Sequence, residues 1–391
     1  MLAYTVNSPP MKTVVAETVL LGREAFETLG KVVVVPDRQI GPEHLKEADA
    51  LIVRSKTKVT PELLAGSDVR FVGTATAGFE HVDFQALEKQ GIGWCAAPGC
   101  NADSVADYFT AALLFLYKNH GVQLEGKTIG IVGVGQVGSR VAKRAEALGL
   151  RVLLNDPPRA AREGDTGFEK LETVLTKSDI IALHVPLITE KPWPTLRMAD
   201  GRFFEQMKRG AVFINAARGK VLDADALLLA KAHGIVAHAV LDVWDPEPCI
   251  RADVLNAATI GTPHIAGHSF EGKLNGTIQI YREACRFFEI APVWNPEALL
   301  PAPAVPELKI DSRGKTDLDV LAEAVLAIYD ISTDRLTDGN AGQFDKLRAK
   351  YRVRREFKNT TVSLSEPRRG LLEKIQAAGF KVSAPPVIST L

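Results

Sequence analysis

The segment TIGIVGVGQVGSRVAKRAEALG, residues 128–149, constrains the fold more than any other part of the 391-residue chain. An apolar, β-branched run leads into glycines at 133, 135 and 138, and an amphipathic helical pattern follows. In a strand–turn–helix unit, Gly133 permits the tight turn, Gly135 lets a pyrophosphate approach the backbone, and Gly138 lets the helix pack closely on the strand. The segment therefore predicts a parallel α/β sheet with an anion site at the helix N-terminus.

A dinucleotide is the anion that best fits this segment. The backbone N–H groups of Gln136 and Val137 belong to the turn, and a second strand-like run ends at Asp156, 23 residues after Gly133. A carboxylate at that spacing accepts hydrogen bonds from the ribose of the adenosine. Its charge repels the 2′-phosphate of NADP, although Arg159 nearby weakens that exclusion. The sequence predicts NAD as the cofactor.

The alternation of strand-like and helix-like runs predicts more than one α/β unit. Dividing the length by about 150 residues per domain gives two or three domains. A long apolar helix is expected at 102–117, a further helix at 274–290, and a linker where prolines stand at 292, 296, 301, 303 and 306. The fold class is α/β, with two doubly wound parallel-sheet domains, flavodoxin-like and Rossmann, and a small α+β C-terminal domain. The expected boundaries are 11–100 with 265–295, 101–264, and 296–391, and the C-terminal helices are expected near 316–330, 342–355 and 367–378.

Composition excludes several classes of function. Forty-seven basic and 47 acidic residues cancel, so no overall field favours nucleic acid or a membrane surface. The four cysteines form no C-x-x-C pair, and no leader or membrane-length apolar run is present, which indicates a cytoplasmic protein. Because a strand-like run begins at Met11, the first ten residues are expected to be an extension.

Three charged residues follow strand-like runs in the second unit. They are Arg218 in NAARGK, Glu247 in DVWDPEP and His264 in TPHIAG. The carboxyl ends of parallel strands meet at one edge of a sheet, so these side chains are expected to converge on the nicotinamide. A histidine is suited to take the proton of an alcohol during hydride transfer, and a carboxylate beside it favours its charged form. A guanidinium binds a carboxylate through paired donors.

Each of these residues also has a purely structural interpretation. Arg218 is compatible with a surface or capping arginine, Glu247 with a solvated loop acid, and His264 with a histidine at a strand end. Asp242 suits either a cofactor contact or a buried acceptor. His264 and His268 are four apart, but a proline and a glycine interrupt any shared helical face, so no metal site is expected.

Four motifs in this order, GVGQVG with Asp156, NAARG, LDVWDPEP and TPHIAG, resemble the D-isomer-specific 2-hydroxyacid dehydrogenases. The stretches VRSKTKV, FVGTATAGFEHVD, PHIAGHSFEGK and GQFDKLRAKYRVRREF resemble one branch of that family, which carries an appended C-terminal domain. This resemblance implies NAD-dependent oxidation of a phosphorylated 2-hydroxy acid, 4-phospho-D-erythronate, on the route to pyridoxal 5′-phosphate. It also implies a homodimer formed through the C-terminal domain.

The resemblance further implies residue roles. Arg218 and Glu247 would be catalytic and His264 the proton donor or acceptor. Two positions depart from the family pattern: Val185 stands where a threonine is usual, and His268 where a tyrosine is usual. The remaining implied contacts are with NAD for Asp156, Asp242 and Gly267, and with substrate for Ser55, Thr76 and His268.

A phosphorylated substrate needs cations. Arg54 lies beside Ser55 in the basic turn VRSKTK, and we hypothesise that it binds the phosphate, helped by Arg354 or Arg355 of the partner subunit. A solvated basic turn is the structural alternative. Two rival functions remain open: a dehydrogenase of the 3-phosphoglycerate or glycerate type, and an NAD-sensing binding protein without turnover.

Overall fold

The first sheet consists of five parallel strands in the order β2-β1-β3-β4-β5. This is the flavodoxin-like order, with the reversal of strand order between β1 and β3. The strands are β1 Met11–Ala16, β2 Gly30–Val35, β3 Ala50–Val53, β4 Phe71–Thr74 and β5 Gly93–Cys95. The helices of this unit are α1 Gly22–Phe26, α2 Pro42–Leu45, α3 Pro61–Leu64, α4 Phe84–Lys89 and α12 Phe270–Phe287.

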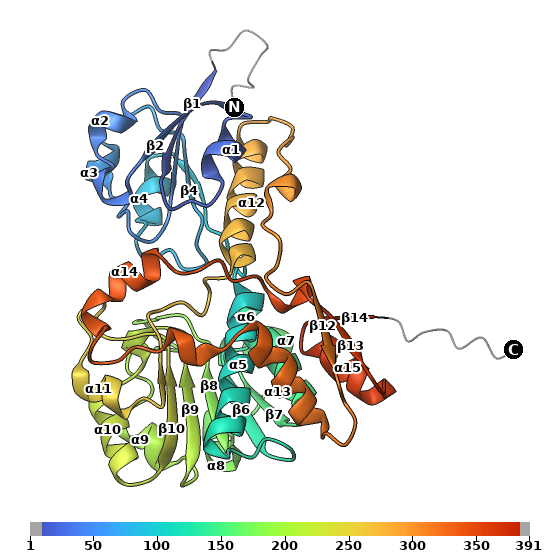
Figure 1. Cartoon of the computed structure of the whole chain (residues 1–391). Helices are drawn as coiled ribbons and strands as arrows, with labels where there is room; N and C mark the ends of the chain where they lie inside the picture. The colour runs from blue at the N-terminus through green and yellow to red at the C-terminus, as the bar shows by residue number, and fades with distance from the viewer. Residues whose placement is uncertain (1–9, 384–391) are drawn as a thin grey trace, which may run out of the picture. The chain divides into compact units, whose positions relative to one another are not determined.

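The sequence of the first unit explains its layers. Every residue of β3 and β4 is buried, as continuous apolar strands of a sheet covered on both faces must be. The long helix α12 comes from a distant part of the chain and packs Ile280, Tyr281 and Ala284 into the same core (Figure 1). It spans Phe270–Phe287, close to the helix predicted at 274–290.

The second sheet has six parallel strands in the order β11-β10-β9-β8-β6-β7. The reversal of strand order lies between β6 and β8, which is where nucleotides bind in open α/β sheets. The strands are β6 Thr128–Val132, β7 Arg151–Asn155, β8 Ile180–Leu183, β9 Ala211–Asn215, β10 Val236–Leu241 and β11 Ile260–Gly261. The helices are α5 Ala102–His120, α6 Gln136–Ala147, α7 Pro157–Glu163, α8 Leu171–Lys177, α9 Gly201–Glu205, α10 Ala224–Ala232 and α11 Ala252–Ala257.

The predicted apolar helix is α5, and its surroundings explain its composition. Leu113, Leu114 and Leu116 are fully buried in a cluster that also contains the strands of the second sheet and the C-terminal helix α13 Asp317–Ile328. A helix covered on opposite sides has no face on which polar residues are needed. The apolar run therefore reflects the C-terminal helices packed over it.

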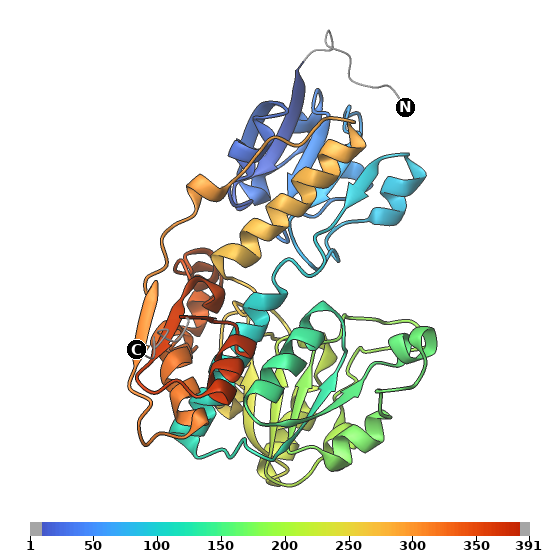
Figure 2. The same cartoon turned by 90° about the vertical axis from the view of Figure 1, so that its right-hand side faces the viewer.

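The C-terminal residues form a small sheet of three parallel strands, β12 Glu307–Ile310, β13 Thr361–Leu364 and β14 Lys381–Val382. Helices α13 and α15 Arg369–Ala377 contact α5 and α6, and Figure 2 shows them alongside those helices. The prediction of a helix at 342–355 is wrong over its second half. Helix α14 spans only Phe344–Ala349, and residues 350–356 run without regular structure.

The computed structural model describes residues 10–383, so most of the expected N-terminal extension lies outside the described residues. The chain divides into two compact units, one with residues up to Asn101 and Ser269–Ala302, the other with Ala102–His268 and residues from Pro303 onward. The predicted α/β fold class with two doubly wound sheets is confirmed. The three-domain division remains a prediction.

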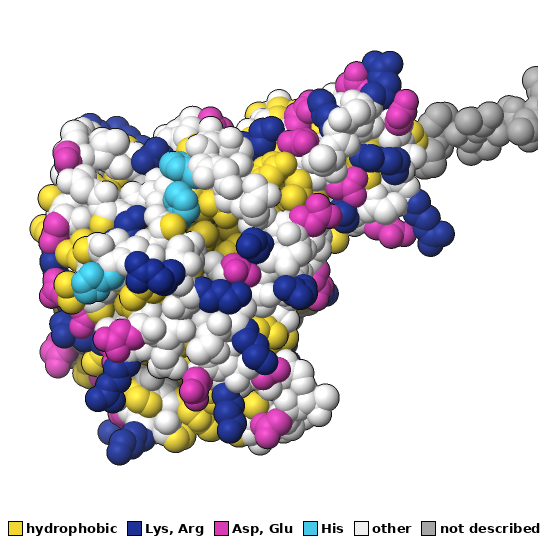
Figure 3. All heavy atoms as spheres, turned by 90° about the horizontal axis from the view of Figure 1, so that it is seen from below, with side chains coloured by type: hydrophobic (Ala, Val, Ile, Leu, Met, Phe, Trp, Pro, Cys, Tyr) yellow, Lys and Arg dark blue, Asp and Glu magenta, His cyan; other side chains and the backbone are white. Residues whose placement is uncertain are grey.

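Two further features concern the charge of the surface and the hydropathy of the helices. Basic and acidic side chains are interspersed over the face shown in Figure 3, in keeping with the balanced composition. Within residues 10–383, no helix is long and apolar enough to cross a membrane.

Candidate active site

The glycine loop follows β6 at the reversal point of the second sheet, and its three glycines meet three different constraints. Gly133 has φ +88°, and a Cβ added there would lie 2.7 Å from the carbonyl oxygen of His184. A Cβ on Gly138 would lie 2.0 Å from the carbonyl oxygen of Gly133. No atom lies within 4 Å of a Cβ added to Gly135. The first and third glycines are thus required by packing, whereas the second faces open space.

This open space fits the pyrophosphate of a dinucleotide. Gly135 is the N-cap of the 12-residue helix α6, and no side chain caps the helix there. The amides of Gln136 and Val137 lie in the first turn of α6, next to Gly135, which has no side chain to cover them. Backbone amides and the helix dipole favour an anion at such a site.

Asp156, directly after β7, holds the glycine loop from the neighbouring strand. Its carboxylate accepts hydrogen bonds from the amides of Val134, at 2.7 Å, and Arg159, at 3.0 Å. Arg159 in turn donates to the carbonyl oxygen of Val134 at 2.6 Å. The residue predicted to contact the ribose therefore also fixes the loop, and Arg159, predicted to weaken the exclusion of NADP, lies beside it.

The connection after β8 brings two residues to the same point. A Cβ on Gly133 would lie 2.8 Å from the Cγ1 of Val185, so the residue that departs from the family pattern packs against the glycine loop. Both ring nitrogens of His184 are buried, and neither has a hydrogen-bond partner among the described residues. Burial lowers the pKa of His184 to about 4, so the ring is neutral. His184 is not among the predicted site residues, although its position directly after β8 is one that a site residue of this sheet could occupy.

The predicted acid and base form a direct pair. The Nδ1 of His264 lies 2.9 Å and 3.1 Å from the two carboxylate oxygens of Glu247. Because Nδ1 faces a carboxylate, it carries the proton, and Nε2 is the nitrogen left to exchange a proton with a substrate. The side chains are 31% and 24% exposed, so the pair is accessible to a small molecule.

The surroundings keep Glu247 ionised. Burial by itself would raise the pKa of Glu247, but the hydrogen bond and charge of His264, the amide of Trp244 and the charge of Arg348 together lower it. The Trp244 amide donates to the carboxylate at 3.0 Å. A carboxylate held in its charged form orients the imidazole and stabilises it when it is protonated.

Asp242 organises the loop that carries the histidine. This buried carboxylate accepts hydrogen bonds from the hydroxyl of Thr262, at 2.6 Å, and from the amides of Ile265 and Ala266, at 2.8 and 2.9 Å. His264 itself has φ +55°, a conformation that costs a residue other than glycine about 1–3 kcal/mol. The three bonds to Asp242 help to hold this strained turn.

Arg218 lies at the end of the adjacent strand β9. Asn215 holds its loop, donating to the carbonyl oxygen of Arg218 at 3.1 Å and accepting from the amide of Ala217 at 3.1 Å. A Cβ on Gly219 would lie 1.8 Å from the carbonyl oxygen of Trp244, so this loop is packed against the one that leads to Glu247. Arg218 and the Glu247–His264 pair thus follow three neighbouring strands at one edge of the sheet.

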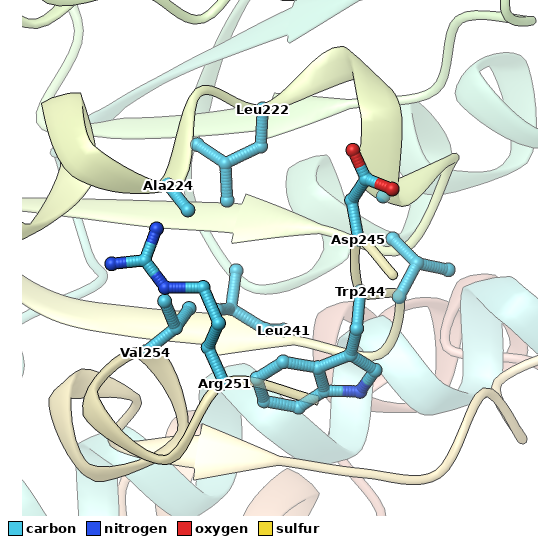
Figure 4. Close-up of a pocket in the computed structure, with 9 residues that line it drawn as sticks. Leu222, Ala224, Leu241, Trp244, Asp245, Arg251 and Val254 are labelled. Atoms are coloured by element: carbon cyan, nitrogen blue, oxygen red, sulfur yellow. The ribbon is translucent and has the colours of Figure 1, made fainter. Parts of the chain in front are cut away.

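Two of the cavities among the described residues of the second unit lie away from the predicted cofactor site. A cavity of about 20 Å³ behind the Arg218 loop, between Leu222, Trp244 and Arg251, has room for about one water molecule (Figure 4). A cavity of about 320 Å³ lies at the amino ends of the strands, beside His120 and His238. Ligands of parallel sheets bind at the carboxyl ends instead.

The predicted substrate residues of the first unit also lie at one edge of their sheet. Arg54 and Ser55 follow β3, Thr76 follows the adjacent strand β4, and Val53 and Thr74 are paired in register. Arg54 donates to the carbonyl oxygen of Thr18, and the hydroxyl of Thr76 donates to the carbonyl oxygen of Gly78 at 2.7 Å. Ser55 is exposed.

A family model described as the D-isomer specific 2-hydroxyacid dehydrogenase NAD binding domain matches residues 115–266, and a domain of unknown function, DUF3410, matches residues 299–379. An erythronate-4-phosphate dehydrogenase of Cronobacter sakazakii is 43% identical over 96% of this chain and 100% of the relative. The chain belongs to the erythronate-4-phosphate dehydrogenase family. A member of this family from Proteus mirabilis is 42% identical over 95% of this chain and 100% of its own.

Solved structures confirm the fold. D-lactate dehydrogenase from Aquifex aeolicus, in complex with NAD and lactic acid, is 27% identical with a TM-score of 0.59, covering 71% of this chain and 95% of its own. The 3-phosphoglycerate dehydrogenase of Entamoeba histolytica, with NAD⁺ bound, is 27% identical with a TM-score of 0.61 and the same coverage. The predicted class, an NAD-dependent dehydrogenase, is confirmed.

The structure groups the predicted site residues into three sets. The glycine-loop residues lie together with Asp156, and Asp242, Gly267 and His268 lie in or beside the loop that carries the Glu247–His264 pair. Arg54, Ser55 and Thr76 form the third set, in the first unit. The side chain of Arg354 is only 4% exposed and donates to Ser104 and Ala266 within its own unit, which speaks against a phosphate contact. The alternative, Arg355, stays a prediction.

Within the described residues, no group of three or more histidine, cysteine, aspartate or glutamate side chains is arranged to hold a metal ion.

Alanine substitutions at two glycines of the loop should affect different properties of the protein. Gly135→Ala places a methyl group in the open space and should weaken NAD binding at least 10-fold, with the melting temperature nearly unchanged. Gly138→Ala forces the helix away from the strand and should lower the melting temperature by several degrees. Cofactor titration by fluorescence and thermal unfolding measure the two effects. Equal loss of stability in both variants would contradict this assignment.

Asp242 predicts a pH-dependent contribution to stability. Burial raises the pKa of Asp242 to about 6, against the opposing charge of His264 and the hydrogen bonds from Thr262, Ala266 and Ile265. The folded protein therefore binds this proton more tightly than the unfolded chain, and the resulting stability is lost as pH rises through about 6. Between pH 5 and pH 7 the wild type should lose about 1 kcal/mol relative to Asp242→Asn. Urea unfolding of both proteins at both pH values checks this, and a constant difference would contradict it.

Proposed function

We propose that the chain catalyses the NAD-dependent oxidation of 4-phospho-D-erythronate to (R)-3-hydroxy-2-oxo-4-phosphooxybutanoate, a step in the biosynthesis of pyridoxal 5′-phosphate. The observation that carries the proposal is the Glu247–His264 pair at the sheet edge that also bears the glycine loop. Relatives named erythronate-4-phosphate dehydrogenase match nearly the whole chain, including its C-terminal residues, which supports this substrate over other 2-hydroxy acids.

The proton chemistry follows from the geometry of the pair. Bound NAD supplies the hydride acceptor. Nε2 of His264 takes the proton of the substrate hydroxyl as the hydride leaves the carbon that bears this hydroxyl. Such general-base catalysis typically contributes about 10² to 10⁴ in rate. Glu247 stabilises the imidazolium that forms, through the hydrogen bond to Nδ1. In the reverse direction the same imidazolium is the acid.

Arg218 has the role of binding the substrate carboxylate and polarising the developing carbonyl. A guanidinium offers paired donors that match a carboxylate, and its charge does not titrate in this pH range. Its place at the end of β9, next to the strand that leads to Glu247, supports this role. His268, in the loop that carries His264, is proposed as a further substrate contact.

The cofactor is proposed to lie along the carboxyl edge of the second sheet. The open space at Gly135 and the uncapped end of α6 support the pyrophosphate contacts, and the strand-end position of Asp156 supports the ribose contact. The residues proposed to contact NAD are Gly133, Gly135, Gln136, Val137, Gly138, Asp156, Asp242 and Gly267.

The assembly and location are proposed on the family resemblance. Residues 296–391 would form a homodimer interface, residues 11–100 with 265–295 the substrate-binding domain, and the protein would act in the cytoplasm. The balanced net charge gives no support to nucleic acid or membrane partners.

Initial rates of NADH formation test the substrate. We expect turnover with 4-phospho-D-erythronate at a kcat/KM at least 100-fold above that for unphosphorylated erythronate, 3-phosphoglycerate and glycerate. His264→Ala should lose nearly all turnover, by a factor of at least 10², while NAD affinity changes less than a few-fold. Faster turnover of another acid would reassign the substrate. Tight NAD binding without turnover of any acid would instead indicate a sensor.

The proposed contact between Arg54 and the substrate phosphate can be tested by substitution. A charged hydrogen bond to phosphate contributes about 1.5–3 kcal/mol, so Arg54→Ala should raise KM for the phosphorylated acid about 10- to 100-fold. KM for the unphosphorylated acid should stay within 2-fold. Lys58→Ala removes an exposed cation of the same turn and is the matched control. An equal effect of both substitutions, or no effect of Arg54→Ala, would exclude this contact.

A further inference from the structure

The C-terminal segment 344–357 runs along the catalytic loop, residues 262–268, and contacts it at three residues. Nε of Arg348 donates to the carbonyl oxygen of His264 at 3.1 Å. Nη2 of Arg354 donates to the carbonyl oxygen of Ala266 at 3.0 Å. The ring of Tyr351 lies 6.2 Å from that of His268, centre to centre. We call segment 344–357 the brace.

The brace is itself firmly held in the second unit. The guanidinium of Arg354 is buried, lies 4.4 Å above the ring of Tyr329, and donates to the hydroxyl of Ser104 on α5 at 2.7 Å. The hydroxyl of Tyr351 donates to Asp334 at 2.6 Å. A cation over an aromatic face, out of water, is a strong attachment.

The end of the brace is tied to the same helix. The amide of Phe357 donates to the buried carboxylate of Asp107 on α5 at 3.0 Å, and Arg144 of α6 donates to the other oxygen of that carboxylate at 3.0 Å. Ser104 also donates to the carbonyl oxygen of Ala266, at 2.7 Å. Helix α5 thus connects the brace and the catalytic loop through Ser104 and Asp107, which are both fully buried.

The catalytic loop is therefore held from two sides by complementary groups. Asp242 accepts from the amides of Ile265 and Ala266, and the brace arginines donate to the carbonyl oxygens of His264 and Ala266. A strained turn persists only where its surroundings determine it from several directions. His264 is such a residue, with φ +55°, and its carbonyl oxygen accepts from Arg348.

We propose that the C-terminal domain, through the brace, sets the position of the catalytic histidine, with Arg348 and Arg354 as positioning residues. This assigns a task to the region that matches a domain of unknown function. The inference rests on the proposed function for its kinetic consequence, but the contacts themselves do not depend on the substrate. Arg348 has a second effect, because its charge favours the ionised form of Glu247, the partner of His264.

Arg348 is the residue to test, because it is only half-buried, whereas truncation of the buried Arg354 endangers folding. Arg348→Met removes the donor and the charge but keeps the aliphatic volume, and Arg348→Lys restores a charged donor. Lys350→Met removes an exposed cation two residues away and is the matched control. Thermal unfolding of the full chain shows that each variant is folded.

We expect Arg348→Met to lower kcat at least 10-fold while KM for NAD and the melting temperature change little, because the histidine is displaced and the glycine loop is not. Arg348→Lys should recover part of the loss, and Lys350→Met should stay within 2-fold of wild type. Equal kcat values in Arg348→Met and wild type, or equal losses in Arg348→Met and Lys350→Met, would overturn the proposal.

A second readout separates this inference from the proposed function. The chain has eight histidines, so the imidazole signals in a ¹⁵N-histidine spectrum can be assigned, with His264→Ala identifying His264. Arg348→Met should shift the His264 signals and Lys350→Met should not. That result in a protein without activity towards any acid would support the brace and refute the proposed function. Unmoved His264 signals in Arg348→Met would refute the brace, whatever the activity.

Discussion

A buried carboxylate, Asp242, is the group on which the active-site geometry most depends. It stands at the end of β10 and accepts three hydrogen bonds from residues 262, 265 and 266, which turn the chain so that His264 faces Glu247. A buried carboxylate is stable only when such donors surround it, so the loop and the acid require each other. The sheet brings the two strand ends together, and the hydrogen bonds to Asp242 orient the loop so that His264 pairs with Glu247.

Much of this arrangement is predictable because it depends on short stretches of the sequence. The three glycines and Asp156 lie within one strand–helix–strand segment, and Arg218, Glu247 and His264 each follow an apolar run typical of a strand. Parallel strands bring such ends to one edge whatever the details of packing. The apolar helix α5 was predictable for the same reason, since its length and composition require cover on opposite sides.

The brace was not predictable, because its contacts join residues that no local pattern relates. Arg348 and His264 are 84 positions apart, and Arg354 and Ala266 are 88 apart. The sequence predicts a helix over residues 342–355, within the segment GQFDKLRAKYRVRREF. Burial of Arg354 against Tyr329 and Ser104 favours the irregular path after Ala349 over helical propensity. Tertiary packing decided the conformation of this segment.

The path of the chain around the catalytic loop has a consequence for synthesis on the ribosome. The four motifs typical of the family all precede residue 269, so they are synthesised before residues 348–354. A nascent chain that has already folded its nucleotide-binding sheet would still lack the two arginines, Arg348 and Arg354, that donate to the main chain of the catalytic loop. The glycine loop can therefore fold before the brace is synthesised, whereas the loop that carries His264 gains its last hydrogen bonds only when residues 348–354 are in place.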